Sequence, residues 1–218
     1  MAAAGRLEPM VRQRVRIRFR KQGDLRLIGH RDLVRLLERL FRRCGLRLGM
    51  SEGFHPKPRM SFPSALALGI EGLDEVMELE LAEPAGAESL LVQLARHAVP
   101  GLSFLSVEIL AQGTKKAQLQ STTYQLPVPD DRRAAAAQCI CGLRCDSAGP
   151  APEALGPDAG LVRQSLEDIR LEEGILRFRL RTSRRRSAGP RDVLAALGLE
   201  DLERSGTCLT RTAVQLQS

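Results

Sequence analysis

The sequence is poor in aromatic residues, with no tryptophan, one tyrosine and six phenylalanines among 218 residues. A hydrophobic core must therefore be built mainly from leucine, valine and alanine, and the overall composition is that of a globular protein. The predicted strands also lack exposed aromatic side chains of the kind on which RNA-recognition modules stack bases. An RNA partner would have to be recognised by its shape and its phosphates, with arginines taking the stacking role.

Long apolar runs are missing as well. No stretch approaches the ~20 apolar residues that a membrane span requires, and residues 1–10 contain no basic start followed by an apolar run. The five cysteines are an odd number, unlike the disulfide framework of a secreted protein. We therefore expect a cytoplasmic protein without a membrane partner.

The signatures of several enzyme classes are also absent. The chain has no G-x-x-x-x-G-K-[ST] phosphate loop, no G-x-G-x-x-G after a strand and no G-x-S-x-G turn, which argues against an NTPase, a Rossmann dehydrogenase and an ordinary hydrolase. Cys139, Cys141 and Cys145 have a C-x-C-x₃-C spacing. This spacing differs from the C-x₃-C-x₂-C that holds the cluster of radical SAM enzymes, so we expect free thiols there.

Positive charge is abundant and concentrated near the N-terminus. The formal net charge is +7, yet the segment from Arg12 to Arg59 alone holds fifteen basic and four acidic residues, a net charge of +11. The rest of the chain therefore carries a net charge of −4. Such a field favours a partner that is acidic or rich in phosphate.

The hydrophobic period in the first half changes repeatedly. Val15, Ile17 and Phe19 alternate with arginines, which predicts a half-buried strand. Apolar residues at helical spacing from Leu33 to Phe41 predict a helix that ends at Gly45. The further elements expected in chain order are a short strand at 46–50, an ordered proline-rich loop at 51–64, a strand at 77–81, a helix at 90–98 and a strand at 102–110.

The same order of elements can be followed in the second half. We expect a strand at 122–128, a helix from Asp130 that stops at Gly142, a mobile loop at 144–160, strands at 166–171 and 175–181, a helix between Pro190 and Gly198, and a strand at 208–216.

The predicted fold class is α+β, with two tandem ferredoxin-like (β-α-β-β-α-β) domains and antiparallel sheets. The expected boundaries are a disordered N-terminus at 1–10, a basic domain at 11–111, a linker at 112–120 and a second domain at 121–218.

Outward-facing arginines on the predicted sheets are the first candidate binding surface. Alternate residues of a strand point to opposite faces, so the arginines would face away from the helices. The predicted binding residues are Arg14, Arg16, Arg18, Arg26, Arg31, Arg35, Lys57, Arg59, Arg177, Arg179 and Arg181. Glu78 and Glu80 could instead pair with the arginines of the first strand. Such pairing would remove the basis for nucleic-acid binding by that strand.

Three segments carry a resemblance to a known family: GDLRLIGHRDLVRLLERLFRRCGL at 23–46, SEGFHPKPRMSFPSALALGIEG at 51–72 and AGPRDVLAALGLE at 188–200. Together they are similar to the radical SAM-linked family, a bacterial domain of unknown function found beside, or fused to the end of, a cobalamin-type radical SAM protein. The resemblance implies a radical SAM protein as partner. It also implies that S-adenosylmethionine, the iron–sulfur cluster and cobalamin belong to that partner, so we expect no cofactor and no metal in this chain.

The loop at 51–64 departs from the family in one respect. The family form resembles GFNPHP, whereas this chain has Gly53, Phe54, His55, Pro56, Lys57 and Pro58. The imidazole has moved by two positions, which weakens any metal or acid–base role for a histidine there. Four residues of the usual form remain, and we expect them to shape the loop: Gly53, Phe54, Pro56 and Pro58.

Three functions remain open from the sequence. The first is an accessory protein that helps a radical SAM enzyme to present a substrate such as RNA or a ribosomal component. The second is a stand-alone RNA-binding module. The third is an RNA-processing enzyme that uses the 51–64 loop, with His30, His55 and Glu52 as catalytic candidates if the loop folds over the start of the first helix.

Overall fold

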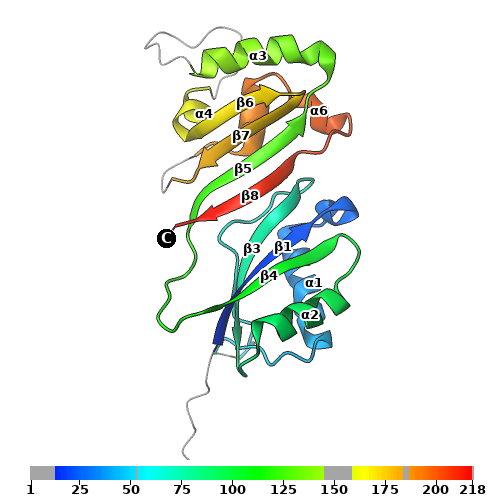
Figure 1. Cartoon of the computed structure of the whole chain (residues 1–218), viewed down its shortest axis with the longest axis vertical. Coiled ribbons are helices and arrows are strands. Elements are labelled where there is room, and N and C mark those ends of the chain that lie inside the picture. Colours follow the sequence, from blue (N-terminus) through cyan, green and yellow to red (C-terminus); the bar gives the residue numbers. More distant parts are fainter. Residues whose placement is uncertain (1–12, 53, 145–158, 184–186, 218) are drawn as a thin grey trace, which may run out of the picture. The chain divides into compact units, whose positions relative to one another are not determined.

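The computed structural model of the protein describes residues 13–52, 54–144, 159–183 and 187–217 (Figure 1). These residues form a mixed α/β fold with eight strands, mostly antiparallel, six α-helices and one short 3₁₀ helix. The chain divides into two compact units. The first unit comprises Met1–Leu68 and Glu75–Ala117, and the second comprises Gly69–Asp74 and Gln118–Ser218.

The first unit pairs its strands in the order β4-β1-β3, with β2 on β3, and β1–β4 and β2–β3 are antiparallel. Its elements are β1 (Gln13–Lys21), the 3₁₀ helix η1 (Gly23–Leu27), α1 (His30–Arg43), β2 (Met60–Ser61), β3 (Glu71–Leu81), α2 (Ala87–His97) and β4 (Leu102–Leu110). The first residues of β3, up to Asp74, belong to the second unit.

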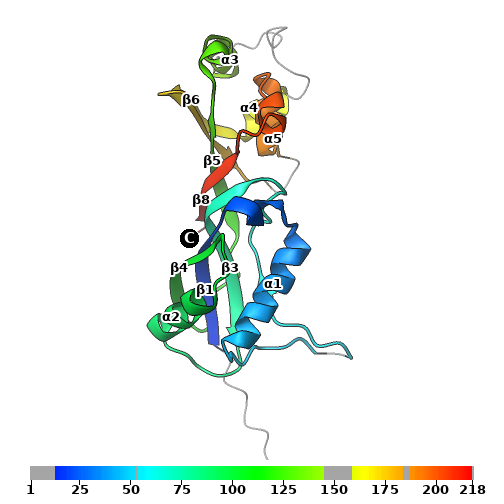
Figure 2. The ribbon, with the colours of Figure 1, turned by 90° about the vertical axis from the view of Figure 1, so that its right-hand side faces the viewer.

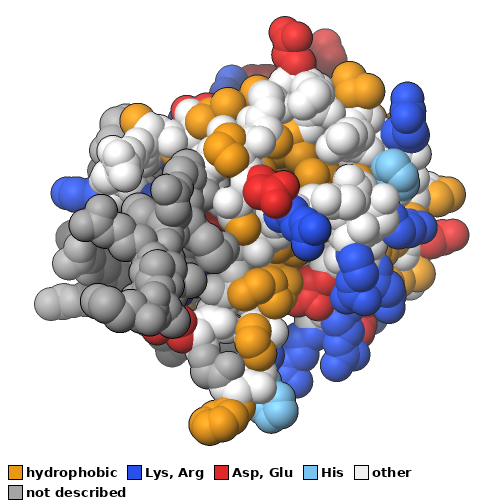
Figure 3. All heavy atoms as spheres, turned by 90° about the horizontal axis from the view of Figure 1, so that it is seen from below, with side chains coloured by type: hydrophobic (Ala, Val, Ile, Leu, Met, Phe, Trp, Pro, Cys, Tyr) orange, Lys and Arg blue, Asp and Glu red, His pale blue; other side chains and the backbone are white. Residues whose placement is uncertain are grey.

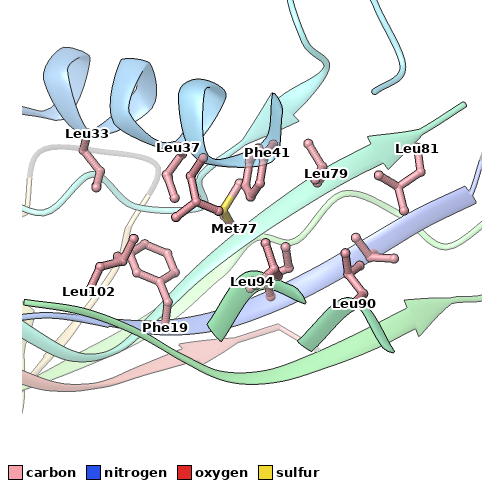
Figure 4. Close-up of a cluster of buried hydrophobic side chains, with 13 residues drawn as sticks. Phe19, Leu33, Leu37, Phe41, Met77, Leu79, Leu81, Leu90, Leu94 and Leu102 are labelled. Atoms are coloured by element: carbon pink, nitrogen blue, oxygen red, sulfur yellow. The ribbon is translucent and has the colours of Figure 1, made fainter. Parts of the chain in front are cut away.

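The core of the first unit lies between these strands and the two helices. In β1 the apolar side chains of Val15, Ile17 and Phe19 are buried, as the alternation predicted. Figure 4 shows the side chains of α1 and α2 pointing towards the strands, where Met77 of β3 lies below α1. Full burial of one such side chain stabilises the fold by about 1.5–3 kcal/mol. This face of the sheet is therefore closed to ligands.

The end of α1 is set by Gly45, as the sequence predicted. The amide of Leu46 donates to the carbonyl of Phe41 at 3.1 Å, and the amide of Gly45 donates to that of Arg42 at 3.0 Å. These two bonds form a Schellman motif, which requires a left-handed residue, and Gly45 has a φ of 69°. The motif directs the chain from α1 back along the end of β3.

The second unit pairs its strands in the antiparallel order β8-β5-β7-β6, and Glu71 and Gly72 pair in parallel with Thr210 and Arg211 of β8. Its elements are β5 (Leu119–Pro127), α3 (Asp130–Arg144), α4 (Ala159–Ser165), β6 (Leu166–Glu172), β7 (Ile175–Arg181), α5 (Pro190–Ala196), α6 (Asp201–Arg204) and β8 (Thr210–Leu216). Tyr124 and Phe178 stack in its core, with ring centroids 5.4 Å apart.

Several predicted elements require correction. The expected strand at 46–50 is reduced to isolated bridges at Leu48 and Met50, while the short strand β2 lies inside the predicted loop 51–64. Gly142 does not stop α3, which continues to Arg144 because the buried Ile140 and Leu143 on its inner face offset the cost of a glycine within a helix.

The predicted connections of the second half are shorter than expected. α4 begins at Ala159, inside the predicted loop 144–160, and β5 begins at Leu119, inside the predicted linker. α6 was not predicted. Residues 1–10 and 145–158 lie outside the described residues. The mixed helix and strand class is confirmed, and the tandem ferredoxin-like arrangement stays a prediction. No helix among the described residues is long and apolar enough to cross a membrane.

Candidate functional site

The arginines of β1 are engaged by carboxylates of neighbouring strands. Glu78 of β3 accepts hydrogen bonds from Nη2 of Arg14 at 2.7 Å and from Nη2 of Arg16 at 3.0 Å. Arg16 also reaches Glu108 of β4 at 3.3 Å. The side chain of Glu78 is only 4 % exposed, whereas those of the two arginines are 25 % and 20 % exposed. The cross-strand pairing with Glu78 considered above is therefore present.

The charge of Glu78 is maintained by these contacts. Burial raises the pKa of this carboxyl, but hydrogen bonds from Arg14, Arg16 and the backbone of Ala117 lower it more, so that the pKa lies below its ordinary value. Glu78 is therefore ionised at neutral pH and neutralises part of the arginine charge. The β1 face does not offer a row of unopposed guanidinium groups.

The arginines of β7 also have polar partners, but these contacts are more exposed than those of Glu78. They alternate with buried Leu176, Phe178 and Leu180, as predicted. Their polar contacts include Arg177 to Glu172 at 3.9 Å, Arg181 to Glu167 at 2.9 Å and Arg179 to Oγ1 of Thr123 at 3.4 Å. Arg26, another predicted binding residue, donates to the carbonyl of Gly23 at 3.2 Å. None of these residues lines the large hollow of the first unit.

That hollow has a volume of about 1200 Å³ and lies between the outer side of α1 and the chain that returns from it. Five cationic side chains and two carboxylates line it, so its charge is positive. Its lining residues are His30, Arg31, Val34, Arg35, Glu38, Arg42, Leu46, Arg47, Leu48, Met50, Pro56, Lys57, Pro58, Ala82 and Glu83. Figure 3 shows Lys and Arg side chains gathered on one side of this end of the first unit.

The cations of the hollow are weakly opposed. Arg35 lies 3.6 Å from Asp32 and Arg47 lies 3.8 Å from Glu83, and all four side chains are more than half exposed. Exposed pairs of this kind contribute about 0–1 kcal/mol. Within the described part of the chain, three further side chains make no hydrogen bond or ion pair: Arg31, Arg42 and Lys57. The hollow can therefore accept several negative charges.

His30 stands at the start of α1 and lines the hollow. Its ring meets that of Phe62 edge to face, with centroids 4.9 Å apart. Phe62 follows β2, so the end of the 51–64 loop lies against His30.

The other two catalytic candidates are elsewhere. His55 is exposed, and the carboxylate of Glu52, 91 % exposed, lies 3.6 Å from Arg59. Neither lines the hollow. In the residues that the structure describes, no three His, Cys, Asp or Glu side chains are grouped so as to hold a metal ion. The hollow therefore contains only one of the three catalytic candidates, His30.

The first part of the 51–64 loop belongs to a hairpin, which we define by its described residues 49–52 and 54–59. At its base the amide of Ser51 donates to the carbonyl of Lys57 at 2.8 Å, and the amide of Lys57 returns a bond to Oγ of Ser51 at 2.9 Å. The amide of Arg59 donates to the carbonyl of Gly49 at 2.7 Å. Figure 2 shows this segment, between α1 and β3, extending away from the helices and strands of the first unit.

Phe54 lies at the tip of the hairpin with a relative exposure of 103 %. Its ring is therefore in solvent, and the loop-shaping role expected for Phe54 stays a prediction. Pro56 and Pro58 line the hollow at the base of the hairpin, and Gly53 lies outside the described residues. Phe54 is thus an exposed aromatic ring outside the strands, and its exposure was not predicted from the sequence.

The described cysteines are Cys44, Cys139, Cys141 and Cys208, and all four are free thiols. Burial raises the pKa of the Cys44 thiol, and the nearby charge of Arg43 only partly offsets this. Cys145 lies outside the described residues. None of the four described cysteines lines the hollow.

Comparison with known protein families assigns the chain to one of them. Residues 14–187 match the family described as "Uncharacterized protein conserved in bacteria (DUF2344)", which covers most of the 218 residues. The chain belongs to this family, whose description assigns no activity.

Two further comparisons add no function. No curated protein matches the chain. Among solved structures, a protein described as an unknown protein from Galdieria sulphuraria is 12 % identical and has a TM-score of 0.29, with 95 % of this chain and 100 % of that chain covered.

Proposed function

We propose that this protein is an accessory protein without catalytic activity of its own, which binds RNA in the basic hollow of its first unit and helps a radical SAM enzyme to act on it. The main support is the hollow itself, in which Arg31, Arg42 and Lys57 have no anionic partner among the described residues. A phosphate backbone supplies regularly spaced negative charges that such cations bind.

The apolar part of the hollow supports a macromolecular ligand over a free ion. Val34 of α1 and Leu48 and Met50 of the returning chain lie among the cations, so a ligand would also bury apolar surface there. Contacts of both kinds suit RNA, which has charged phosphates and flat, less polar bases.

The radical SAM part of the proposal is supported by the resemblance of residues 23–46 and 51–72 to the radical SAM-linked family. These two segments contribute α1 and the hairpin, so most of the hollow is built from them. The strand orders β4-β1-β3-β2 and β8-β5-β7-β6 also support the proposal that each unit is a ferredoxin-like domain.

The RNA proposal is tested by measuring affinity for a structured RNA across a salt series. Each lost phosphate contact reduces the slope of log affinity against log salt by roughly 0.7–0.9. The combined variant Arg31→Gln, Arg42→Gln, Lys57→Gln should therefore flatten the slope by about 2–3.

The matched control removes the same charge from β7, as Arg177→Gln, Arg179→Gln, Arg181→Gln. It should leave the slope unchanged. If the β7 variant flattens the slope and the hollow variant does not, the binding surface lies on β7. If the wild-type protein binds no RNA, the proposal is wrong.

The partnership is tested separately. The tagged protein, expressed in a bacterium that encodes a neighbouring cobalamin-type radical SAM protein, should copurify with it. Failure to associate, both with and without S-adenosylmethionine, would contradict the accessory role and leave RNA binding as a stand-alone function.

A further inference from the structure

The hairpin has the properties of a rigid projecting element. Four hydrogen bonds join its two sides near the base, including one from Nε of Arg59 to the carbonyl of Met50 at 3.0 Å. Pro56 and Pro58 have fixed φ angles, which further limits the conformations of the returning side. The tip is therefore held out from the fold at little further cost in conformational entropy when a ligand binds.

Phe54 at the tip is unusual among the aromatic residues of this chain. Phe19, Phe41 and Phe178 are buried, and Phe62 and Phe104 are partly buried. A single exposed apolar side chain is common on protein surfaces and does not mark a site by itself. Here the ring stands on a braced hairpin next to a basic hollow, and this combination suits a ligand that offers both flat apolar surface and negative charge.

The hairpin and the hollow are continuous along the chain. Pro56, Lys57 and Pro58 line the hollow, and Phe54 precedes them by two residues. The ammonium group of Lys57 is exposed and has no partner among the described residues. If the phosphates of a ligand occupy the hollow, the groups adjacent to those phosphates would therefore reach the tip of the hairpin.

We propose that Phe54 stacks on an unpaired nucleobase of the RNA whose phosphates bind in the hollow, so that the hairpin selects single-stranded nucleotides over paired ones. This inference rests on the proposed function. A ring exposed on both faces can stack on any base, but only on one that is free of its duplex neighbours. The recognised feature would thus be a loop, a bulge or an unpaired end next to a negatively charged backbone.

Because the chain contains no tryptophan, a single tryptophan introduced at the tip can test the stacking directly. In the variant Phe54→Trp the only indole would lie at the tip, and stacking on a base should quench its fluorescence. The probes are a single-stranded RNA of about 12 nucleotides and a blunt-ended RNA duplex of similar length. The matched control is Val92→Trp on α2, at a side chain that is 60 % exposed.

We expect the single strand to quench Phe54→Trp and not Val92→Trp, and the duplex to quench neither. Phe54→Ala should weaken binding of the single strand by about tenfold or more, since stacking on one base typically contributes that much. Phe54→Leu should weaken it similarly, because leucine retains the apolar volume and loses the flat ring.

Two outcomes would overturn the inference and leave the proposed function intact. In the first, the wild-type protein binds RNA with the expected salt slope, but Phe54→Trp is not quenched and Phe54→Ala binds as the wild type does. In the second, the indole responds to vesicles of anionic phospholipid and not to single-stranded RNA. If the wild-type protein binds no RNA at any salt concentration, both proposals fail together.

Discussion

At the scale of single residues, Glu78 is the side chain that neutralises two arginines of β1 in the first unit. It is nearly fully buried and joins two arginines that come from alternate positions of β1. A buried carboxylate is tolerated here because each oxygen accepts a charged hydrogen bond. The arginines that looked like a binding surface thus stabilise the sheet instead.

Replacement of the Glu78 carboxylate should measurably lower the free energy of unfolding. Glu78→Gln would leave two guanidinium groups without their shared anion, and we expect a loss of about 1–3 kcal/mol in the free energy of unfolding. The control is Glu108→Gln, which removes a carboxylate that is 62 % exposed from the same Arg16 and should cost less than about 1 kcal/mol. Urea unfolding of both variants measures the difference, and equal midpoints would contradict the assigned role.

The same prediction has a pH dependence. Because the pKa of Glu78 is lower in the folded protein than its ordinary value of 4.5, its contribution to stability is complete above that value. The contribution is lost as the pH falls through the lower folded value. The difference in stability between wild type and Glu78→Gln should therefore be constant above the ordinary pKa and shrink progressively as the pH falls below it.

At the scale of elements, the turn that leads into β4 is closely fitted to the chain that follows β1. The amide of Gln22 donates to the carbonyl of Gly101 at 2.8 Å. Gly101 has a φ of +84°, and a Cβ at this position would lie 2.4 Å from the carbonyl oxygen of Gln22. Only glycine therefore allows this contact, which sets where β4 begins to pair with β1.

Gly113 offers a matched comparison, because it also has a φ of +84° but no neighbouring group lies within 4 Å of the position that an alanine Cβ would occupy. Gly113→Ala should cost about 1–2 kcal/mol for the backbone conformation alone. Gly101→Ala should cost about 1–3 kcal/mol more, because atoms also overlap. Thermal unfolding of the two variants separates these contributions, and equal costs would contradict the close approach.

At the scale of the whole molecule, the two units have separate cores, and the hollow and the hairpin belong entirely to the first. The second unit contributes the stacked pair of Tyr124 and Phe178, which lie on the paired strands β5 and β7. Binding at the hollow and packing in the second unit are therefore expected to respond to different substitutions.

Phe178→Leu tests this division. Loss of the stacked ring should lower the stability of the second unit by about 1–2 kcal/mol. RNA affinity and its salt slope should stay at wild-type values at temperatures where the protein remains folded. The measurements are differential scanning calorimetry and the salt series described above. A loss of affinity in the folded variant would indicate that the second unit takes part in binding.

The sequence predicted local elements better than contacts between them. The period of two in β1 and in β7 and the helical spacing in α1 follow from which side chains must be buried, and these elements are confirmed. Gly45 was also predicted correctly, because a helix end is decided by a few adjacent residues. The 46–50 strand was wrong because that segment pairs only through isolated bridges, from Leu48 to Leu81 and from Met50 to Pro58, and the sequence does not reveal such pairing.

The sequence alone determined the alternation of buried and charged positions, the end of α1 and the excess of positive charge in the first 59 residues, since each is a property of neighbouring residues. The tertiary structure decided which cations are neutralised. Glu78 is 62 residues beyond Arg16 in the chain, and only strand pairing brings them together. The same long-range packing leaves Arg31, Arg42 and Lys57 around one hollow and places the ring of Phe54 in solvent.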